Sequence, residues 1–251
     1  MKLFRTTFAA PASRGVRTRS YGGFPRWVQA LIVAAGFGLA VFGGLSSAQA
    51  QQRPVKLVVL GDSLSAGYGL PAAQGFPARL SRALKAKGLA VDVIDAGVSG
   101  DTASGGLARI DWSVPEGTDA VIVELGANDA LRGLDPKVTR SALDKIVRRL
   151  KERRIEVLVA GMHAPRNLGP DYARSFDGIY SDIARTHGAL HYPFFLAGVV
   201  GDARLNLRDG IHPNAEGIDV IVARILPKVE ELITRVRAKS RSLRRREFPG
   251  R

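Results

Sequence analysis

The sequence predicts an α/β fold in which a five-stranded parallel sheet lies between two layers of helices. Short apolar segments that suit buried strands alternate with longer segments of helical periodicity, which is the pattern of βαβ units. The apolar segments are continuous, as expected of parallel strands that are covered on both faces. Right-handed crossovers place helices on both sides of such a sheet. We therefore predict a flavodoxin-like, three-layer α/β/α sandwich.

Five segments have the length and composition of buried strands. The first ends at Gly61, as a parallel strand does before a turn. Ligands of open α/β sheets bind at the carboxyl ends of the strands, so we expect functional residues directly after the first four segments. The predicted strands are Val55–Leu60, Val91–Asp95, Ala120–Leu125, Ile155–Ala160 and Ala189–Tyr192.

Four segments have helical periodicity and recognisable ends. A glycine follows two of them, and glycine commonly terminates a helix. Proline opens a third segment at Pro136, where its missing N–H has no cost. The predicted helices are Phe76–Lys87, Pro136–Arg154, Tyr172–His187, and a last one that begins near Asn214 and continues past Leu232.

The composition is that of an ordinary globular protein of one domain. The chain has 251 residues, of which 45% are apolar and 24% are charged. It contains no cysteine. Disulfide bonds, thiolate metal sites and a thiol nucleophile are therefore excluded.

The net charge of +14 resides at the two ends of the chain. Residues 1–50 carry a charge of +6, and residues 235–251 carry +7, which leaves +1 for the long segment between them. This central segment shows no basic groove interleaved with stacking aromatic residues. We therefore expect no nucleic-acid partner.

The first 50 residues are predicted to be an export signal. A basic stretch precedes the uncharged segment Trp27–Leu45, and Ala48-Gln-Ala50 then provides the small-x-small pattern of a cleavage site. Cleavage would leave Gln51 as the first residue, and the protein would be periplasmic or secreted. The alternative is an uncleaved membrane anchor, because the apolar segment approaches the roughly 20 residues that span a bilayer.

The chain then divides into a domain over residues 51–234 and a basic tail over residues 235–251. We expect the tail to be a solvated and partly disordered end. The alternative function of the tail is weak attraction to anionic lipid head groups at a membrane surface.

Polar, chemically useful residues follow the predicted strands. The segment Gly61-Asp-Ser-Leu-Ser65 follows the first strand, Gly97–Thr102 the second and Gly126–Asp129 the third. A fourth segment, Asp209-Gly-Ile-His-Pro-Asn214, precedes the last helix. Because the strand ends share one edge of the sheet, these segments are expected to meet there.

In order and spacing these segments resemble the SGNH (GDSL-type) hydrolases over about residues 55–234. Ser63 matches the family's first block, Gly100 the second, Asn128 the third, and Asp209 with His212 the last. The resemblance is greatest to the bacterial acyl-thioesterase, lysophospholipase and arylesterase branch, on the segments Gly61–Tyr68, Ser99–Thr102, Gly105–Arg109 and Leu131–Gly133.

The same residues suit nucleophilic acyl transfer. A serine hydroxyl needs a neighbouring base, which His212 supplies, and Asp209 would fix the tautomer of His212. The oxyanion of the tetrahedral intermediate needs donors that are already aimed at it. We expect these donors to be the backbone N–H groups of Ser63 and Gly100 and the side-chain amide of Asn128.

Each of these residues also has a purely structural interpretation. Ser63 could cap a helix, and Asn128-Asp129 could form a loop turn. For Asp62, Asp101 and Asp129 we prefer structural hydrogen bonding to catalysis.

The remaining histidines are not expected to bind a metal. His187 and His191 are four residues apart, which on a helix would make a metal pair, but Gly188 interrupts the helix between them. His163 follows the fourth strand, and we expect it to line the substrate cleft. Neither a metal nor an organic cofactor is predicted.

The leading interpretation is a serine esterase that hydrolyses aryl and short-to-medium acyl esters, with thioesters and lysophospholipids as further substrates. A carbohydrate O-acetylesterase is the alternative enzyme, because the same residues serve that reaction in the family. A non-catalytic ligand-binding module on this scaffold is the alternative of another class. The sequence leaves the oligomeric state open.

Overall fold

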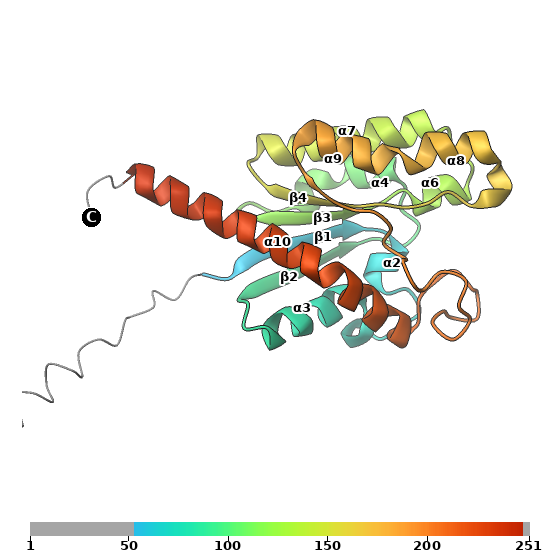
Figure 1. Cartoon of the computed structure of the whole chain (residues 1–251), viewed down its shortest axis with the longest axis horizontal. Coiled ribbons are helices and arrows are strands. Elements are labelled where there is room, and N and C mark those ends of the chain that lie inside the picture. Colours follow the sequence, from blue (N-terminus) through green and yellow to red (C-terminus); the bar gives the residue numbers. More distant parts are fainter. Residues whose placement is uncertain (1–52, 248–251) are drawn as a thin grey trace, which may run out of the picture. The chain divides into compact units, whose positions relative to one another are not determined.

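The computed structural model describes residues 53–247, which contain a five-stranded sheet with helices on both faces (Figure 1). All strands are parallel, and their order is β2-β1-β3-β4-β5. This is the predicted flavodoxin-like order. The strands are β1 (Val55–Gly61), β2 (Val91–Gly97), β3 (Ala120–Glu124), β4 (Glu156–Ala160) and β5 (Leu190–Tyr192).

The two central strands form the core of the sheet. Leu57 to Leu60 of β1 and Ala120 to Val123 of β3 are almost completely buried, because helices cover both of their faces. At the carboxyl end, Gly61 of β1 is in register with Gly97 of β2 and with Glu124 of β3. The strand order reverses between β1 and β3, because β2 lies on one side of β1 and all later strands lie on the other. A ligand crevice is expected at the carboxyl ends of the strands at this point.

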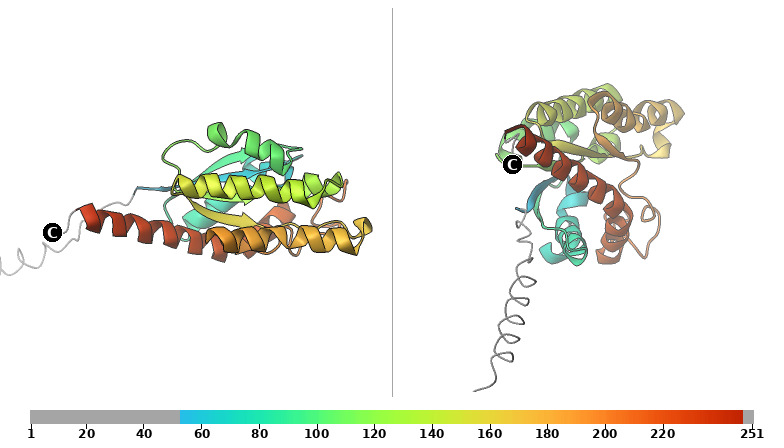
Figure 2. Two further views of the ribbon diagram at one scale, coloured as in Figure 1. Left: turned by 90° about the horizontal axis from the view of Figure 1, so that it is seen from above. Right: turned by 60° about the vertical axis from the view of Figure 1, so that its left-hand side comes forward.

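Two layers of helices cover the sheet, as the right-hand view of Figure 2 shows. One layer contains α3 (Phe76–Ala86) and α10 (Ala215–Glu247), and the other contains α4 (Ala103–Ala108), α7 (Pro136–Glu152), α8 (Pro170–Asp177) and α9 (Ile179–His187). Short helical turns connect the longer elements. They are α2 (Ser63–Ala66), η1 (Ala72–Gln74), α5 (Ile110–Ser113), α6 (Ala127–Leu131) and η2 (Arg166–Leu168). Of these, α2 and α6 begin within three residues of the carboxyl ends of β1 and β3.

The prediction of one helix over Tyr172–His187 is wrong, because α8 and α9 are separate helices. The break falls at Gly178, which caps both of them. Glycine is a poor helix former, and the Asp177 side chain before it accepts a hydrogen bond from the backbone N–H of Ala164 (2.8 Å). Gly178 keeps a helical φ of −76°, so α9 continues α8 with little change of direction.

The basic tail is helical as far as Glu247, so the expectation of a partly disordered end is wrong for this segment. Val236 packs into the core, and the Lys239 ammonium donates to the Arg154 carbonyl (2.9 Å) and to Glu156 (2.8 Å). Alternating basic residues resemble a tail in the sequence, but lysine and arginine are also good helix formers. The boundary predicted at residue 234 therefore falls within α10.

The predicted signal segment, residues 1–50, lies outside the described part of the chain. Between residues 53 and 247, the structure contains no helix with the length and apolar character needed to cross a membrane.

Candidate active site

Ser63 occupies the first turn after β1, at the start of α2. The N-cap of α2 is Asp62, whose carboxylate accepts a hydrogen bond from the backbone N–H of Leu64 (3.0 Å). The interpretation of Ser63 as a helix cap is therefore wrong, and its hydroxyl is available for another contact. Ser63 is only 8% exposed, and it borders a cleft at the carboxyl edge of the sheet.

The structure brings Ser63, His212 and Asp209 together as a connected set. The Oγ atom of Ser63 lies 3.0 Å from Nε2 of His212, and Nδ1 of the same ring lies 2.8 Å from Asp209 Oδ2. Because one ring nitrogen faces the hydroxyl and the other faces the carboxylate, Asp209 favours the tautomer whose Nε2 accepts a proton. This arrangement can activate the hydroxyl as a nucleophile.

Asp209 is held in its ionised form by its own turn. Its Oδ1 atom accepts hydrogen bonds from the backbone N–H groups of His212 (3.0 Å) and Ile211 (2.9 Å). These two bonds, together with the His212 ring, lower the pKa of Asp209 to about 2. The spacing of three residues between Asp209 and His212 thus produces a closed turn in which the carboxylate both orients the imidazole and stays charged.

The two predicted backbone donors are the N–H groups of Ser63 and of Gly100. Gly100 follows β2 and has a φ of +86°, a left-handed conformation that favours glycine. Within residues 53–247, no hydrogen bond to the backbone N–H of Ser63 or of Gly100 is found. The Gly100 carbonyl accepts from the guanidinium of Arg132 (2.9 Å), so the peptide group that follows the donor is held in place.

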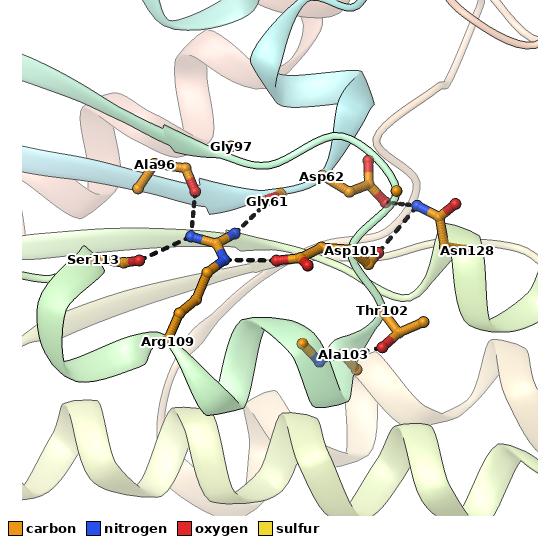
Figure 3. Close-up of polar contacts among 12 residues, drawn as sticks. Gly61, Asp62, Ala96, Gly97, Asp101, Thr102, Ala103, Arg109, Ser113 and Asn128 are labelled. Atoms are coloured by element: carbon orange, nitrogen blue, oxygen red, sulfur yellow. Dashed lines mark hydrogen bonds and ion pairs between the residues drawn. The ribbon is translucent and has the colours of Figure 1, made fainter.

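Asn128, the third predicted donor, lies in α6 after β3. Its Nδ2 atom donates to Asp62 Oδ2 (3.1 Å) and to the Asp101 carbonyl (3.0 Å) (Figure 3). Both hydrogens of the amide are therefore engaged in this state of the protein. A developing oxyanion is a stronger acceptor than a neutral carbonyl and would compete with Asp101 for one of them.

Two carboxyl groups lie buried beneath the nucleophile turn. Burial raises the pKa of Asp62 to about 6. Burial, and then the charge of Asp62, raises the pKa of Glu124 well above its usual range. Its Oε2 atom lies 3.4 Å from the backbone nitrogen of Asp62. A Cβ atom on Gly61 would come within 2.6 Å of this oxygen, so glycine at 61 makes room for Glu124.

Asp101 and Asp129 have the structural roles that we expected of them. Asp129 is buried and accepts from the backbone N–H of Ala103 (2.8 Å) and from the Thr139 hydroxyl (3.0 Å). Asp101 pairs with the buried guanidinium of Arg109 (2.6 Å). Both carboxylates therefore brace the loops that carry the candidate residues.

An open cleft of about 510 Å³ extends from Ser63 and His212 along the carboxyl edge. The size is typical of small-molecule sites. The ring of His163 stacks on Phe194 at 4.3 Å in the wall of the cleft, as expected of a residue that lines it. Most other lining side chains are apolar, among them Leu64, Leu131, Met162, Leu196, Val200 and Ile211.

The remaining histidines lie away from the cleft. His187 contacts Asp144 (2.7 Å) between α9 and α7, and His191 lies on β5 beyond the break at Gly188. The two rings are thus on different elements. Among the described residues, no group of three or more His, Cys, Asp or Glu side chains could hold a metal ion.

Sequence reasoning missed Glu124 and Arg109 as parts of the site. The available signal for Glu124 was a single acidic residue inside the apolar segment Ala120–Leu125. A charged residue in a strand that is buried on both faces needs a partner or a function. For Arg109 the only sign was its place among the segments that resemble one branch of the hydrolases.

Comparison with known proteins agrees with this geometry. A model of the GDSL-like lipase/acylhydrolase family matches residues 59–220. An arylesterase of Vibrio mimicus is 41% identical over 179 residues, which are 71% of this chain and 88% of that protein. Thioesterase 1/protease 1/lysophospholipase L1 of Escherichia coli (strain K12) is 35% identical over 178 residues, with 70% of this chain and 84% of the relative covered.

A solved structure supports the same assignment. The crystal structure of AlinE4, an SGNH-hydrolase family esterase, is 42% identical and has a TM-score of 0.61, with 71% of this chain and 96% of that chain covered. The family model spans more than half of this chain, and the matched residues include the turn after β1 and the strand ends around it. The protein is therefore a member of the GDSL-like lipase/acylhydrolase family.

Proposed function

We propose that the protein hydrolyses aryl and short-to-medium acyl esters, and also acyl thioesters and lysophospholipids, through an acyl intermediate on Ser63. Family membership makes the protein a serine-dependent carboxylic ester hydrolase that acts on small-molecule esters. The observation that carries the finer proposal is the contact chain from Ser63 Oγ through His212 to Asp209, at the mouth of an apolar cleft.

The reaction would proceed in two halves. His212 Nε2 takes the hydroxyl proton of Ser63 while Oγ attacks the carbonyl carbon of the ester. The tetrahedral intermediate collapses, the bond to the alcohol breaks, and the proton on His212 passes to the leaving oxygen. Water then attacks the acyl-serine in the same way, and Ser63 regains its proton. Asp209 stays ionised throughout and stabilises the imidazolium that forms twice.

The negative charge on the carbonyl oxygen would be stabilised by three donors. The backbone N–H groups of Ser63 and Gly100 supply two, and the Asn128 amide supplies the third as its bond to the Asp101 carbonyl gives way. Charge-assisted hydrogen bonds are about twice as strong as neutral ones, which favours this exchange only when the oxyanion has formed. Donors that act in the transition state raise kcat rather than substrate affinity.

The test of this function is hydrolysis of p-nitrophenyl esters from acetate to palmitate. We expect the highest kcat/KM at a short or medium chain, because the cleft is apolar but open and of moderate size. Mass spectrometry after treatment with an aryl phosphonate should place the covalent adduct on the Ser63 peptide. Strict preference for acetate would instead indicate a carbohydrate O-acetylesterase. Failure to hydrolyse any ester would indicate a non-catalytic binding module.

We propose further that residues 1–50 direct export and are removed after Ala50. The support is the order of basic, apolar and small-residue segments in the sequence. Amino-terminal sequencing of the protein recovered from its host should begin at Gln51 in the periplasmic or secreted fraction. Recovery of the uncleaved chain in the membrane fraction would indicate an anchor instead.

The basic end of α10 would attract the protein weakly to anionic lipid. Its exposed turn includes Arg241, and Arg244, Arg245 and Arg246 follow. Each basic residue near an anionic surface contributes about 1 kcal/mol. Replacing Arg244, Arg245 and Arg246 by glutamine should therefore weaken binding to phosphatidylglycerol vesicles about 10²-fold.

The glutamine variant keeps the length of the chain and a residue of good helix propensity, so loss of structure would not explain the result. Phosphatidylcholine vesicles, which carry no net charge, are the matched control and should bind both proteins equally poorly. Equal binding of the variant and the wild type to the anionic vesicles would contradict the proposal.

A further inference from the structure

Arg109 is a buried cation that contacts none of the three residues of the proposed catalytic triad, and the mechanism above leaves it without a function. It lies between α4 and α5 and is only 6% exposed. A guanidinium has five N–H donors and is always charged, so a buried one requires several well-placed acceptors. Figure 3 shows that the acceptors of Arg109 come from the ends of β1 and β2, from the loop that follows β2 and from α5.

Two of these acceptors are backbone carbonyls at the ends of the neighbouring strands β1 and β2. Nη2 donates to the Gly61 carbonyl (2.8 Å), and Nη1 donates to the Ala96 carbonyl (2.7 Å) and to the Ser113 hydroxyl (2.9 Å). Nε donates to Asp101 (2.6 Å). The rigid, planar group therefore fixes the last residues of β1 and β2 relative to each other and to the loop that follows β2.

Two of the four acceptors, Gly61 and Asp101, lie within two residues of a proposed oxyanion donor. Gly61 lies two residues before Ser63, and Asp101 directly follows Gly100. The Gly61 carbonyl also accepts from the backbone N–H of Val98 (3.1 Å), so it joins the two strand ends a second time. One side chain thus connects the two turns whose free N–H groups must point at the same oxygen.

The third donor is reached through Asp101. Its carboxylate contacts Arg109, while its own carbonyl accepts from the Asn128 amide (3.0 Å). None of the residues that bond to Arg109 lines the cleft. A displacement of Arg109 would therefore disturb the donors while leaving the apolar acyl-binding walls intact.

We infer that Arg109 is a positioning residue for the oxyanion hole, which sets the relative placement of the Ser63, Gly100 and Asn128 donors. The inference rests on the proposed ester hydrolysis and adds a residue that acts through its neighbours rather than on the substrate. A misplacement of about 1 Å at a reacting centre can lower the rate about 10²-fold, so small shifts of this network would be visible in the kinetics.

The test compares the wild type with Arg109→Lys. Lysine keeps the positive charge but cannot occupy the separate acceptors with a planar fork. We expect kcat for p-nitrophenyl butyrate to fall about 10²-fold with little change in KM. The matched control is Arg149→Lys, which makes the same replacement at an exposed arginine that pairs with Asp111 (2.6 Å), and its kinetics should equal those of the wild type.

A second readout separates donor placement from general damage. In the thionoester analogue, sulfur replaces the carbonyl oxygen and accepts hydrogen bonds poorly, so a well-formed hole strongly favours the ordinary ester. If Arg109 determines where the oxyanion-hole donors lie, the ratio of kcat/KM for the ester to kcat/KM for the thionoester should decrease in Arg109→Lys. An unchanged ratio, whether or not both rates fall, would overturn the inference.

Asp101→Asn is the alternative variant if Arg109→Lys does not fold. It removes the carboxylate charge that Arg109 Nε contacts but keeps the Asp101 backbone carbonyl, so the ester-to-thionoester ratio should decrease by a smaller factor. An unchanged ratio in this variant also overturns the inference. If the ratio is unchanged but the wild type is active, only the inference about Arg109 is refuted. If the wild type hydrolyses no ester, the proposed function and the inference are both refuted.

Discussion

Replacing Ser63 by alanine is expected to lower kcat for ester hydrolysis by about 10⁶-fold, the loss seen when the nucleophile of a comparable triad is removed. The substitution deletes only Oγ, which lies 3.0 Å from His212, and it keeps the backbone N–H that is proposed to bind the oxyanion. The residual rate should therefore remain about 10³–10⁴-fold above that of the uncatalysed reaction. Burst kinetics with p-nitrophenyl esters would measure the rate of acylation in the wild type and the decrease in that rate in Ser63→Ala.

The matched control is Ser65→Ala, in the same turn. The Ser65 hydroxyl donates to the Asp62 carbonyl (3.2 Å) and also contacts the buried Glu124. Among the described residues it forms no hydrogen bond with His212, so this variant should retain most of its activity. Thermal unfolding of both variants would exclude loss of structure. If Ser63→Ala keeps its rate, the acyl-serine mechanism is refuted.

The second large effect is expected for Asp209→Asn, with a loss of about 10⁴-fold in kcat. Asparagine keeps the shape of the side chain, and its oxygen can still accept from the backbone N–H groups of Ile211 and His212. It cannot stabilise the imidazolium, and its amide favours the tautomer whose Nε2 carries a proton. That tautomer cannot act as a base toward Ser63.

The pH dependence provides a further test of Asp209. Its pKa is lowered to about 2, so the carboxylate remains ionised in the wild type until the pH falls through this value. The stabilisation that this group gives the fold is present above its unfolded pKa and is lost only toward pH 2. Protonation of Asp209 should therefore not limit the wild-type kcat between pH 5 and 9. Because Asp209→Asn has no carboxyl group to titrate, its loss of kcat should persist across this range, over which kcat should be measured.

Asp202→Asn is a well-matched control for this substitution. Asp202 lies in the same loop region, its pKa is also lowered to about 2, and its carboxylate pairs with the exposed Arg204 (2.7 Å) rather than with a histidine. We expect this variant to have wild-type kinetics. Equal losses in the two variants would indicate a general effect of the loop and would contradict the assigned function of Asp209.

The fold was predictable because its determinants are local in the sequence. The buried strands are continuous apolar segments, and the rule that parallel strands present ligands at their carboxyl ends places Ser63, Gly100 and Asn128 at one edge. Asp209 and His212 were identifiable because they are three residues apart, so a single turn can present both side chains. The break at Gly178 was missed because helical periodicity continues across it. Gly178 itself has helical dihedral angles, and only the hydrogen-bonding pattern changes there.

The network beneath the site was not predictable from local patterns. Arg109 is one of 37 lysine and arginine residues, and apart from its place in a segment that resembles one branch of the family, its sequence does not distinguish it from a surface cation. Its acceptors come from Gly61, Ala96 and Asp101, which are separated along the chain and meet only in the folded sheet. Part of the cleft wall comes from the irregular segments after β4 and β5, which have no periodicity to interpret.

The course of α10 determines which way the cleft would face at a lipid surface. The helix begins at Ala215, three residues after His212, and by Lys239 it has reached Arg154 and the start of β4, at the opposite edge of the sheet. A helix of 33 residues spans about 50 Å. If its basic end rests on anionic lipid, the mouth of the cleft points into the surrounding water. An enzyme held this way would take its esters from solution or from a facing surface, and not from the leaflet to which it is bound.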